Sequence, residues 1–212
     1  IEWKTRAGMR TAVIVQARLG SKRFPGKVLA TLAGKPVLAH VIERCLKIDA
    51  EELIVAVPHE TPDELKDVAR SVKVIEGPED DVLERYFIAS NAYPIDIIMR
   101  ITADCPLIEP SLCDKVLALY RAGGCGYAAI GEGRTFPKGY GCEVFSKFTL
   151  DLANQLATDP YDREHVTPWM ERNVRCKYLT QPKDESHLNY CIDVPGDIER
   201  LERILDERAQ IS

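Results

Sequence analysis

The sequence contains no Cys-x-x-Cys pair, no apolar run of membrane-spanning length and no recognisable signal peptide. Its seven cysteines are an odd number and lack the spacing of zinc ligands. These absences predict reduced, mostly buried thiols in a cytoplasmic protein that has no membrane segment.

An excess of positive charge is also missing. Lys and Arg number 28 against 33 Asp and Glu, which makes the net charge −5. Nucleic-acid-binding domains are typically basic, so we expect no nucleic-acid partner. With 212 residues, 45% hydrophobic and 29% charged, the chain fits a single soluble domain. We expect that domain to span residues 9–212, with residues 1–8 lying outside it as vector-derived or disordered chain.

Two standard phosphate-binding motifs are absent. A Walker A loop requires G-x-x-x-x-G-K-[ST], but here five residues separate Gly20 from Gly26, and Val28 follows Lys27. The dinucleotide fingerprint G-x-G-x-x-G does not occur in this loop either. Neither of these two phosphate-binding folds is therefore predicted.

The same stretch nevertheless has the properties of a phosphate site. Residues 13–15 are apolar and β-branched, which predicts a buried strand. The loop after them contains two glycines and four cations, Arg18, Lys22, Arg23 and Lys27. Glycine lets a backbone come close to a ligand, and peptide N–H groups with cationic side chains neutralise a polyphosphate. We interpret the loop as a site for a small anionic ligand; the alternative is a basic surface loop.

Apolar periodicity predicts alternating strands and helices along the first half of the chain. The expected strands are residues 13–15, 53–57, 73–75 and 95–101. The expected helices are residues 36–46, 61–70, 80–92 and 110–122, the second of them opened by a capping box. This order is typical of an α/β fold with a parallel sheet covered on both faces.

The second half is less regular. Strands are expected at residues 127–130, 142–145, 177–180 and 190–193. Helices are expected at residues 146–156, at 161–173 with a break at Pro168, and around 198–205. Residues 131–141 are glycine-rich and too long for a simple connection. We interpret residues 131–145 as a dimerisation or substrate arm.

Two aspartates follow predicted strands. Asp104 comes after the strand at 95–101, and Asp193 ends the strand at 190–193. In open α/β sheets ligands bind beyond the carboxyl ends of the strands, which places Asp104 and the basic loop on one edge. Mg²⁺ is commonly held by one or two carboxylates together with phosphate oxygens, so Asp104 is a candidate metal ligand; the alternative is a turn cap. Asp193, which precedes a predicted helix, can serve as its N-cap.

The basic loop resembles the signature R-x-x-S-x-R-x-P-x-K of the cytidylyltransferases that make CMP-activated sugars. The matching residues are Arg18, Ser21, Arg23, Pro25 and Lys27. Within that family the chain is most similar to the branch named for spore coat polysaccharide biosynthesis protein F. The likeness covers most of residues 10–200.

Two further elements carry the resemblance. Asp104-Cys105-Pro106 matches the family's Asp-x-Pro element, which supplies a metal ligand. Asp193 begins a partial match to the Asp-Thr-Pro-Glu-Asp element, which supplies the second ligand, with Val194 and Gly196 departing from it.

The resemblance implies a fold, an activity and a set of site residues. The fold is the three-layer αβα, Rossmann-like nucleotide-diphosphosugar transferase fold with a mostly parallel sheet. The activity is transfer of CMP from CTP to an acidic sugar or related acceptor with release of pyrophosphate, by a Mg²⁺-dependent homodimer. The implied nucleotide contacts are Gln16, Ala17, Arg18, Gly20, Ser21, Arg23, Lys27, Arg100 and Thr102. Among the implied site residues, Arg18, Lys27 and Asp104 are catalytic, and Asp104 and Asp193 bind metal. The implied acceptor contacts are Glu143, Arg163, Glu164 and His165, of which the last three would face either the acceptor or the dimer partner.

Two stretches leave alternatives open. Residues 77–86 resemble the base-recognition side of the family's pocket, although a surface ion pair between Asp81 and Arg85 explains their spacing equally well. Gly141 stands where the family pattern has an Asp, which puts a sugar contact from that loop in doubt.

Three rival functions remain at this point. One is a sugar nucleotidyltransferase that uses UTP or GTP. Another is a GT-A-type glycosyltransferase, which would consume a nucleotide sugar. The third is a non-catalytic nucleotide-sensing module.

Overall fold

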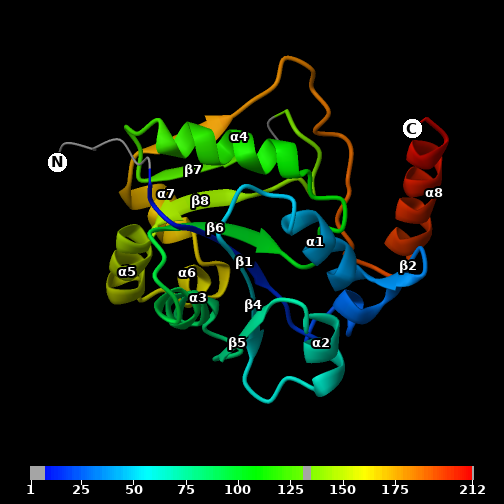
Figure 1. The fold of residues 1–212 in the computed structure, drawn as a ribbon, viewed down its shortest axis with the longest axis horizontal. Helices are drawn as coiled ribbons and strands as arrows, with labels where there is room; N and C mark the ends of the chain where they lie inside the picture. Colours follow the sequence, from blue (N-terminus) through cyan, green and yellow to red (C-terminus); the bar gives the residue numbers. More distant parts are fainter. Residues whose placement is uncertain (1–7, 131–134, 212) are drawn as a thin grey trace.

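The computed structural model describes residues 8–130 and 135–211. Its centre is a seven-stranded sheet in the order β5-β4-β1-β6-β8-β7-β9. The strands are β1 (Thr11–Gln16), β4 (Glu52–Pro58), β5 (Lys73–Gly77), β6 (Ile97–Thr102), β7 (Tyr127–Ile130), β8 (Glu143–Ser146) and β9 (Cys176–Leu179). Helices cover both faces of this sheet (Figure 1), which confirms the expected α/β architecture.

The two faces of the sheet carry separate helices and separate apolar cores. One face packs against α1 (Val37–Cys45), α2 (Asp63–Val68) and α4 (Pro110–Arg121). The other packs against α3 (Val82–Asn91), α5 (Lys147–Leu156) and α7 (Pro168–Asn173). Along β1, Val13 and Val15 face the first core while Ala12 and Ile14 face the second. Since side chains alternate along a strand, a strand buried on both faces reads as a continuous apolar run.

The central strands bring two distant loops to one edge. β1 pairs in parallel with β6, and Gln16 lies opposite Thr102 at their carboxyl ends. The basic loop after Gln16 and the turn that holds Asp104 therefore leave the sheet side by side. The sheet is mostly parallel as expected, but β8 runs antiparallel to both β6 and β7. The amino end of β8 consequently lies at the same edge, with Glu143 opposite Arg100.

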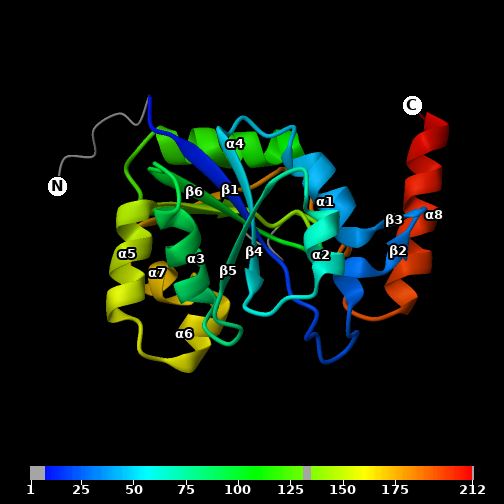
Figure 2. The same cartoon turned by 60° about the horizontal axis from the view of Figure 1, so that its bottom comes forward.

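A small unit at one end of the molecule combines the predicted C-terminal helix with a 3₁₀ helix and a hairpin that were not predicted. It contains the 3₁₀ helix η1 (Lys27–Leu29), the hairpin of β2 (Thr31–Leu32) and β3 (Lys35–Pro36), and the C-terminal helix α8 (Gly196–Ile211). Figure 2 shows α8 beside this hairpin, away from the main sheet. Leu32, Ile192 and Leu201 belong to the apolar cluster that joins these elements. The unit ties the end of the basic loop to the segment that carries Asp193.

Two local expectations were wrong. The predicted capping box is absent, because the Thr61 hydroxyl donates to the Pro58 carbonyl at 2.6 Å instead of capping α2. The predicted strand at 190–193 is an extended segment outside the sheet. Its strand-like pattern reflects burial of Cys191 and Ile192. By contrast, the predicted break at Pro168 is confirmed, since α6 (Pro160–His165) ends before α7 begins.

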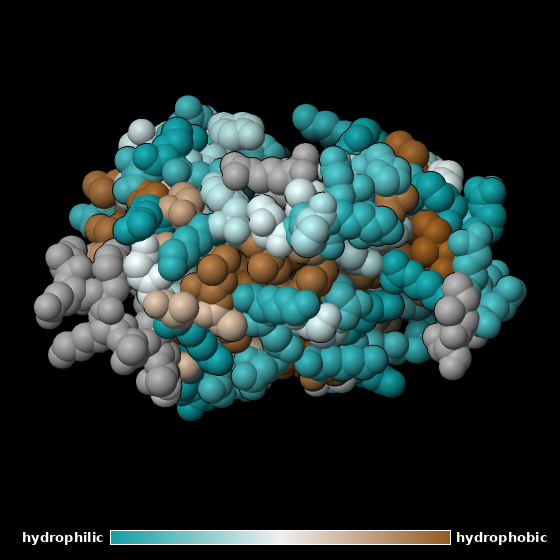
Figure 3. Space-filling model, turned by 90° about the horizontal axis from the view of Figure 1, so that it is seen from above, coloured by the Kyte–Doolittle hydropathy of each residue, from teal (hydrophilic) through white to brown (hydrophobic). Residues whose placement is uncertain are grey.

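The predicted arm at 131–145 is only partly described. Residues 131–134 lie outside the described residues, and the end of the stretch belongs to β8. The surface seen in Figure 3 is mainly hydrophilic, with hydrophobic residues gathered in a band across the middle. Among the described helices, none combines the length and the apolar character that crossing a membrane requires. All seven cysteines are free and six are buried, as expected.

The backbone conformation and the close neighbours of Gly139 should allow only glycine at this position. Gly139 has a φ of 98°, and a Cβ there would lie 2.7 Å from the Tyr190 carbonyl carbon. We predict that Gly139→Ala lowers the free energy of unfolding by about 1–3 kcal/mol. Gly196→Ala is the matched control, because a Cβ there has nothing within 4 Å. Urea unfolding of both variants provides the measurement, and equal stability would contradict the prediction.

Candidate active site

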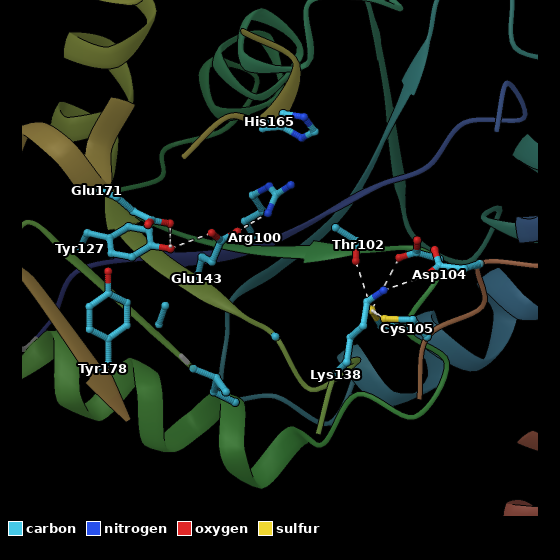
Figure 4. A pocket seen from close by; sticks show the side chains of 15 residues that line it. Arg100, Thr102, Asp104, Cys105, Tyr127, Lys138, Glu143, His165, Glu171 and Tyr178 are labelled. Carbon is cyan, nitrogen blue, oxygen red and sulfur yellow. Dashed lines mark hydrogen bonds and ion pairs between the residues drawn. The ribbon is translucent and has the colours of Figure 1, made fainter. Parts of the chain in front are cut away.

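Two cavities meet at the carboxyl edge of β1 and β6. The first, called here the loop cavity, has a volume of about 710 Å³ and lies between the basic loop and the segments that carry Glu79 and Glu164. The second, the sheet cavity, has a volume of about 590 Å³ and lies over β6, β7 and β8 (Figure 4). The residues lining both cavities are Thr102, Asp104, His165 and Asp193. Any reaction between ligands in the two cavities would take place at these shared residues.

A cluster of opposite charges occupies the junction. The Lys27 ammonium donates to Asp104 Oδ2 at 2.6 Å and to the Ile192 carbonyl at 2.8 Å, and it lies 3.8 Å from Asp193 Oδ1. Burial raises the pKa of the Asp104 carboxyl group, but attraction to Lys27 and hydrogen bonds outweigh burial, so its pKa lies below the ordinary value. Asp104 is therefore a charged group held in a largely enclosed place. If Asp104 only capped a turn, its ion pair with Lys27 would have no explanation.

Asp193 is held with both carboxylate oxygens engaged. Oδ1 accepts from Arg23 and Oδ2 from Lys138, each at 2.7 Å. The N–H groups of Asp193 and Val194 donate to Asp197 Oδ2 at 2.8 and 2.9 Å. Asp197 on α8 thus holds the backbone that precedes the helix, while the Asp193 carboxylate, which the sequence suggested as an N-cap, is directed at cations.

The donor set fits a magnesium ion. Among the described residues there is no group of three or more His, Cys, Asp or Glu side chains suited to a metal. Mg²⁺, however, typically takes one or two carboxylates and completes its shell with phosphate oxygens and water. Asp104 and Asp193, with a cation already lying close to both, supply such a pair.

The basic loop lines the loop cavity as predicted. The N–H groups of Ser21 and Gly26 both donate to the Leu19 carbonyl at 2.9 Å, which closes the loop on itself. Gly26 has a φ of 72°, a conformation that favours glycine, and Lys27 begins η1 directly after it. The predicted residues that line this cavity are Gln16, Arg18, Gly20, Ser21, Arg23, Lys27 and Thr102.

Two predicted nucleotide contacts lie elsewhere. Ala17 is 2% exposed, and its N–H donates to the Ala56 carbonyl at 3.0 Å. Arg100 lines the sheet cavity, where it forms an ion pair with Glu143, and its Nε donates to Gln16 Oε1 at 3.1 Å. Arg100 therefore links the two cavities through Gln16.

Glu143 is the centre of a buried polar network. Its carboxylate pairs with Arg100 and accepts from Tyr127 at 2.7 Å and from Thr167 at 2.6 Å. Burial raises the pKa of Glu143, but attraction to Arg100 and the hydrogen bonds outweigh burial, so its pKa lies below the ordinary value of a glutamate. Figure 4 shows Tyr127, Glu143 and Glu171 grouped on the side of the cavity opposite Asp104. Sequence reasoning missed Tyr127, because a tyrosine in a strand carries no signal beyond β propensity.

Three of the four residues predicted to face the acceptor lie next to one another on α6 but contact different parts of the molecule. Arg163 donates to Asp81 at 2.6 and 2.9 Å and to Asn154, which joins α6 to α3 and α5. Glu164 lines the loop cavity and lies 3.2 Å from Arg18. His165 lines both cavities.

Arg85 is buried, and of the two alternatives that the sequence left open for its segment, the surface ion pair is not found. Arg85 does not pair with Asp81; its guanidinium donates to the Pro78 carbonyl at 2.6 and 3.0 Å and to the Glu79 carbonyl at 2.8 Å. Arg85 is 1% exposed, and burial lowers its pKa. A Cβ at Gly77 would lie 2.9 Å from Arg85 Cγ, and one at Gly20 would lie 2.8 Å from Glu79 Oε1. Arg85 thus supports a wall of the loop cavity that abuts the basic loop.

These features define a class of protein. A mostly parallel sheet carries a basic, glycine-bearing loop at one edge, where the carboxylates of Asp104 and Asp193 lie at the junction of two cavities that each accommodate a small molecule. That is the arrangement of a nucleotide-binding transferase.

The model of the cytidylyltransferase family matches residues 12–211, so the chain belongs to this family of CTP-dependent nucleotidyltransferases. A cytidylyltransferase structure from Leptospira borgpetersenii superimposes with a TM-score of 0.86 at 31% identity, covering 92% of this chain and 85% of that one. The 3-deoxy-manno-octulosonate cytidylyltransferase of Yersinia pseudotuberculosis is 35% identical, over 79% of this chain and 71% of that protein. Spore coat polysaccharide biosynthesis protein SpsF of Bacillus subtilis is 26% identical, over 93% and 87%. The resemblance inferred from the motifs is confirmed.

Glu143→Gln is predicted to change how stability depends on pH. Because the folded-state pKa of Glu143 is lowered, its charge stabilises the fold at every pH above the pKa of an unfolded glutamate, and the contribution is lost as pH falls through the lowered pKa. At neutral pH the variant leaves Arg100 buried without its charge partner, which costs about 3–5 kcal/mol. The loss should shrink as the solution is acidified.

Urea unfolding at neutral and acidic pH measures this effect. Asp151→Asn is the control, because its ion pair with Lys147 lies at the surface and contributes at most about 1 kcal/mol. A Glu143→Gln protein with wild-type stability at neutral pH would refute the prediction.

Proposed function

We propose that this protein transfers CMP from CTP to a hydroxyl group of an acidic sugar or related small acid, with release of pyrophosphate. The observation that carries the proposal is the junction of the two cavities at Asp104 and Asp193. CTP would lie in the loop cavity and the acceptor in the sheet cavity. The reacting α-phosphate and hydroxyl would then meet beside these two carboxylates.

The basic loop has the composition that this reaction needs. Arg18, Ser21, Arg23 and Lys27 would bind the triphosphate, which carries several negative charges. Phosphoryl-group chemistry depends mainly on positioning and on neutralising charge. Lys27 and Arg18 would stabilise the charge that develops on the departing pyrophosphate.

Asp104 and Asp193 would hold Mg²⁺ when it binds with CTP. The ion supplies Lewis-acid stabilisation of the reacting phosphate. Lys27, which contacts Asp104 and lies close to Asp193, would hold the two carboxylates side by side. Arg23 and Lys138 fix Asp193 from opposite sides in the same way.

Two cationic side chains that could bind an acidic acceptor line the sheet cavity. Lys138 lies beside Asp193 at the junction, and Arg100 lies at the far side with Glu143. Gly141 lines this cavity where the family pattern has an Asp, so this position adds no negative charge. Relatives named for 3-deoxy-manno-octulosonate and for spore coat polysaccharide support a sugar acid as the acceptor.

The wall supported by Arg85 would select the base. Since the carbonyls of Pro78 and Glu79 point at Arg85, the N–H groups of the same trans peptides, on Glu79 and Asp80, point the opposite way. Within the described part of the chain neither N–H donates to another backbone group, and both residues line the loop cavity. Two adjacent donors match the O2 and N3 acceptors of cytosine, whereas uracil carries a hydrogen on N3.

Asp104→Asn is predicted to abolish most turnover. Removing one electrostatic stabiliser should lower turnover by about 10²–10³-fold. The folded protein should also lose stability, because the neutral amide would no longer form an ion pair with Lys27. The assay is pyrophosphate release from CTP, Mg²⁺ and a panel of sugar acids, with UTP, GTP and ATP as alternative donors.

Asp206→Asn, at an exposed position on α8, is the control and should keep wild-type turnover. A folded Asp104→Asn protein with near-wild-type turnover would end the assignment of Asp104. Equal pyrophosphate release from all four nucleotides would overturn the cytidine assignment, and no release with any acid would overturn the reaction.

Arg85→Met is predicted to reduce the preference for CTP over UTP. The preference is measured by the rise in melting temperature with each nucleotide and Mg²⁺. Each hydrogen bond from the charged guanidinium stabilises the backbone of Pro78 and Glu79 by about 1.5–3 kcal/mol, and the methionine variant loses these bonds. Arg70→Met, which changes an exposed arginine just after α2, should leave the preference intact. If the methionine variant does not fold, Arg85→Lys serves instead, and an unchanged CTP preference in either folded variant would refute the role.

A further inference from the structure

Two cysteines lie in contact beside the junction of the cavities. The Sγ atoms of Cys105 and Cys191 are 3.4 Å apart, although the residues are separated by 86 positions in the sequence. They are 2% and 5% exposed, and both line the sheet cavity. A small oxidant that enters this cavity therefore reaches a pair of thiols rather than a single one.

Each cysteine lies next to one of the two junction carboxylates. Cys105 follows Asp104 directly, and Cys191 comes two residues before Asp193. The two segments run side by side, since the Ile192 N–H donates to the Asp104 carbonyl at 2.9 Å. The Cys105 thiol also donates to Asp104 Oδ1 at 3.6 Å. A displacement of either sulfur atom therefore also moves the backbone next to Asp104 and Asp193.

The sulfur atoms are already close to bonding distance. A disulfide has an S–S length of about 2.05 Å, so they need to approach by only about 1.3 Å. The hydrogen bond between the two segments holds the backbones together during that approach.

We propose that Cys105 and Cys191 form a reversible disulfide that lowers activity at the junction. With hydrogen peroxide as the oxidant, two S–H bonds and the O–O bond break, one S–S bond forms, and two waters are released. Both electrons pass from the sulfur atoms to the peroxide. A dithiol reductant returns the pair to two thiols by exchange.

The disulfide changes the junction in two ways. It removes the thiol hydrogen that Cys105 donates to Asp104, and it draws the backbones of both aspartate-bearing segments together. A displacement of about 1 Å among positioning groups can lower turnover by about 10²-fold. This effect on turnover rests on the proposed function, whereas formation of the disulfide does not.

The test treats the protein with hydrogen peroxide and then with dithiothreitol. Non-reducing peptide mapping should show Cys105 linked to Cys191, with a loss of two hydrogen atoms in intact mass. The melting temperature should rise, because the link closes a long loop in the unfolded chain. Turnover should fall by about 10²-fold and return after reduction.

Three variants sharpen the result. Cys105→Ser and Cys191→Ser should each abolish the linked peptide, and each should show the same turnover before and after peroxide. Cys176→Ser, which removes the half-buried thiol on β9, should still form the link and lose turnover like the wild type. The quantity compared is the ratio of turnover after and before oxidation for each protein.

The outcomes separate this proposal from the proposed function. Absence of the linked peptide, or conversion to sulfinic and sulfonic acids that dithiothreitol does not reverse, would overturn the disulfide. If the disulfide forms completely and turnover is unchanged, the proposal that the disulfide lowers activity is refuted. If the reduced protein shows no cytidylyltransferase activity at all, the proposed function fails, while mapping, mass and melting temperature still decide whether the disulfide forms.

Discussion

The ammonium group of Lys27 between Asp104 and Asp193 is the contact on which the rest of the site depends. It joins three segments that are far apart in the sequence: the basic loop, the turn after β6 and the extended segment before α8. Partly buried charges are stable only when they are paired and hydrogen-bonded. Each segment therefore stabilises the position of the other two, and the two cavities take their shape from this shared contact.

The same cluster explains the elements that surround it. The 3₁₀ helix η1 starts at Lys27, so the loop cannot shift without moving the ammonium group. Asp197 and Arg200 fix the segment before α8 through its backbone groups. The hairpin and α8 lie away from the main sheet, yet they hold Asp193 in register with Asp104. The stability of this peripheral unit is thus linked to the geometry of the site.

Much of this arrangement could be predicted from the sequence. The order of apolar segments predicts the sheet, and the strand-end rule places Asp104 beside the basic loop. The remainder depends on contacts that leave no local pattern. The sequence could not decide between the two alternatives for Arg85, because its partners are backbone carbonyls, which every residue possesses. Cys191 and Ile192 resembled a strand because burial, rather than sheet pairing, determines their apolar character. The partners of Glu143 come from three separate elements, so no spacing rule could connect them.

The antiparallel placement of β8 has a consequence for how such enzymes diversify. Because β8 enters the sheet at the edge where β6 and β7 end, the sheet cavity takes most of its lining from residues after 126. The loop cavity takes most of its lining from residues before 105. Under the proposed function, the first half of the chain lines most of the nucleotide site and the second half lines most of the acceptor site. On that assignment, substitutions in the second half would change the acceptor while the nucleotide site is inherited unchanged, so that one ancestral scaffold would supply different activated sugars.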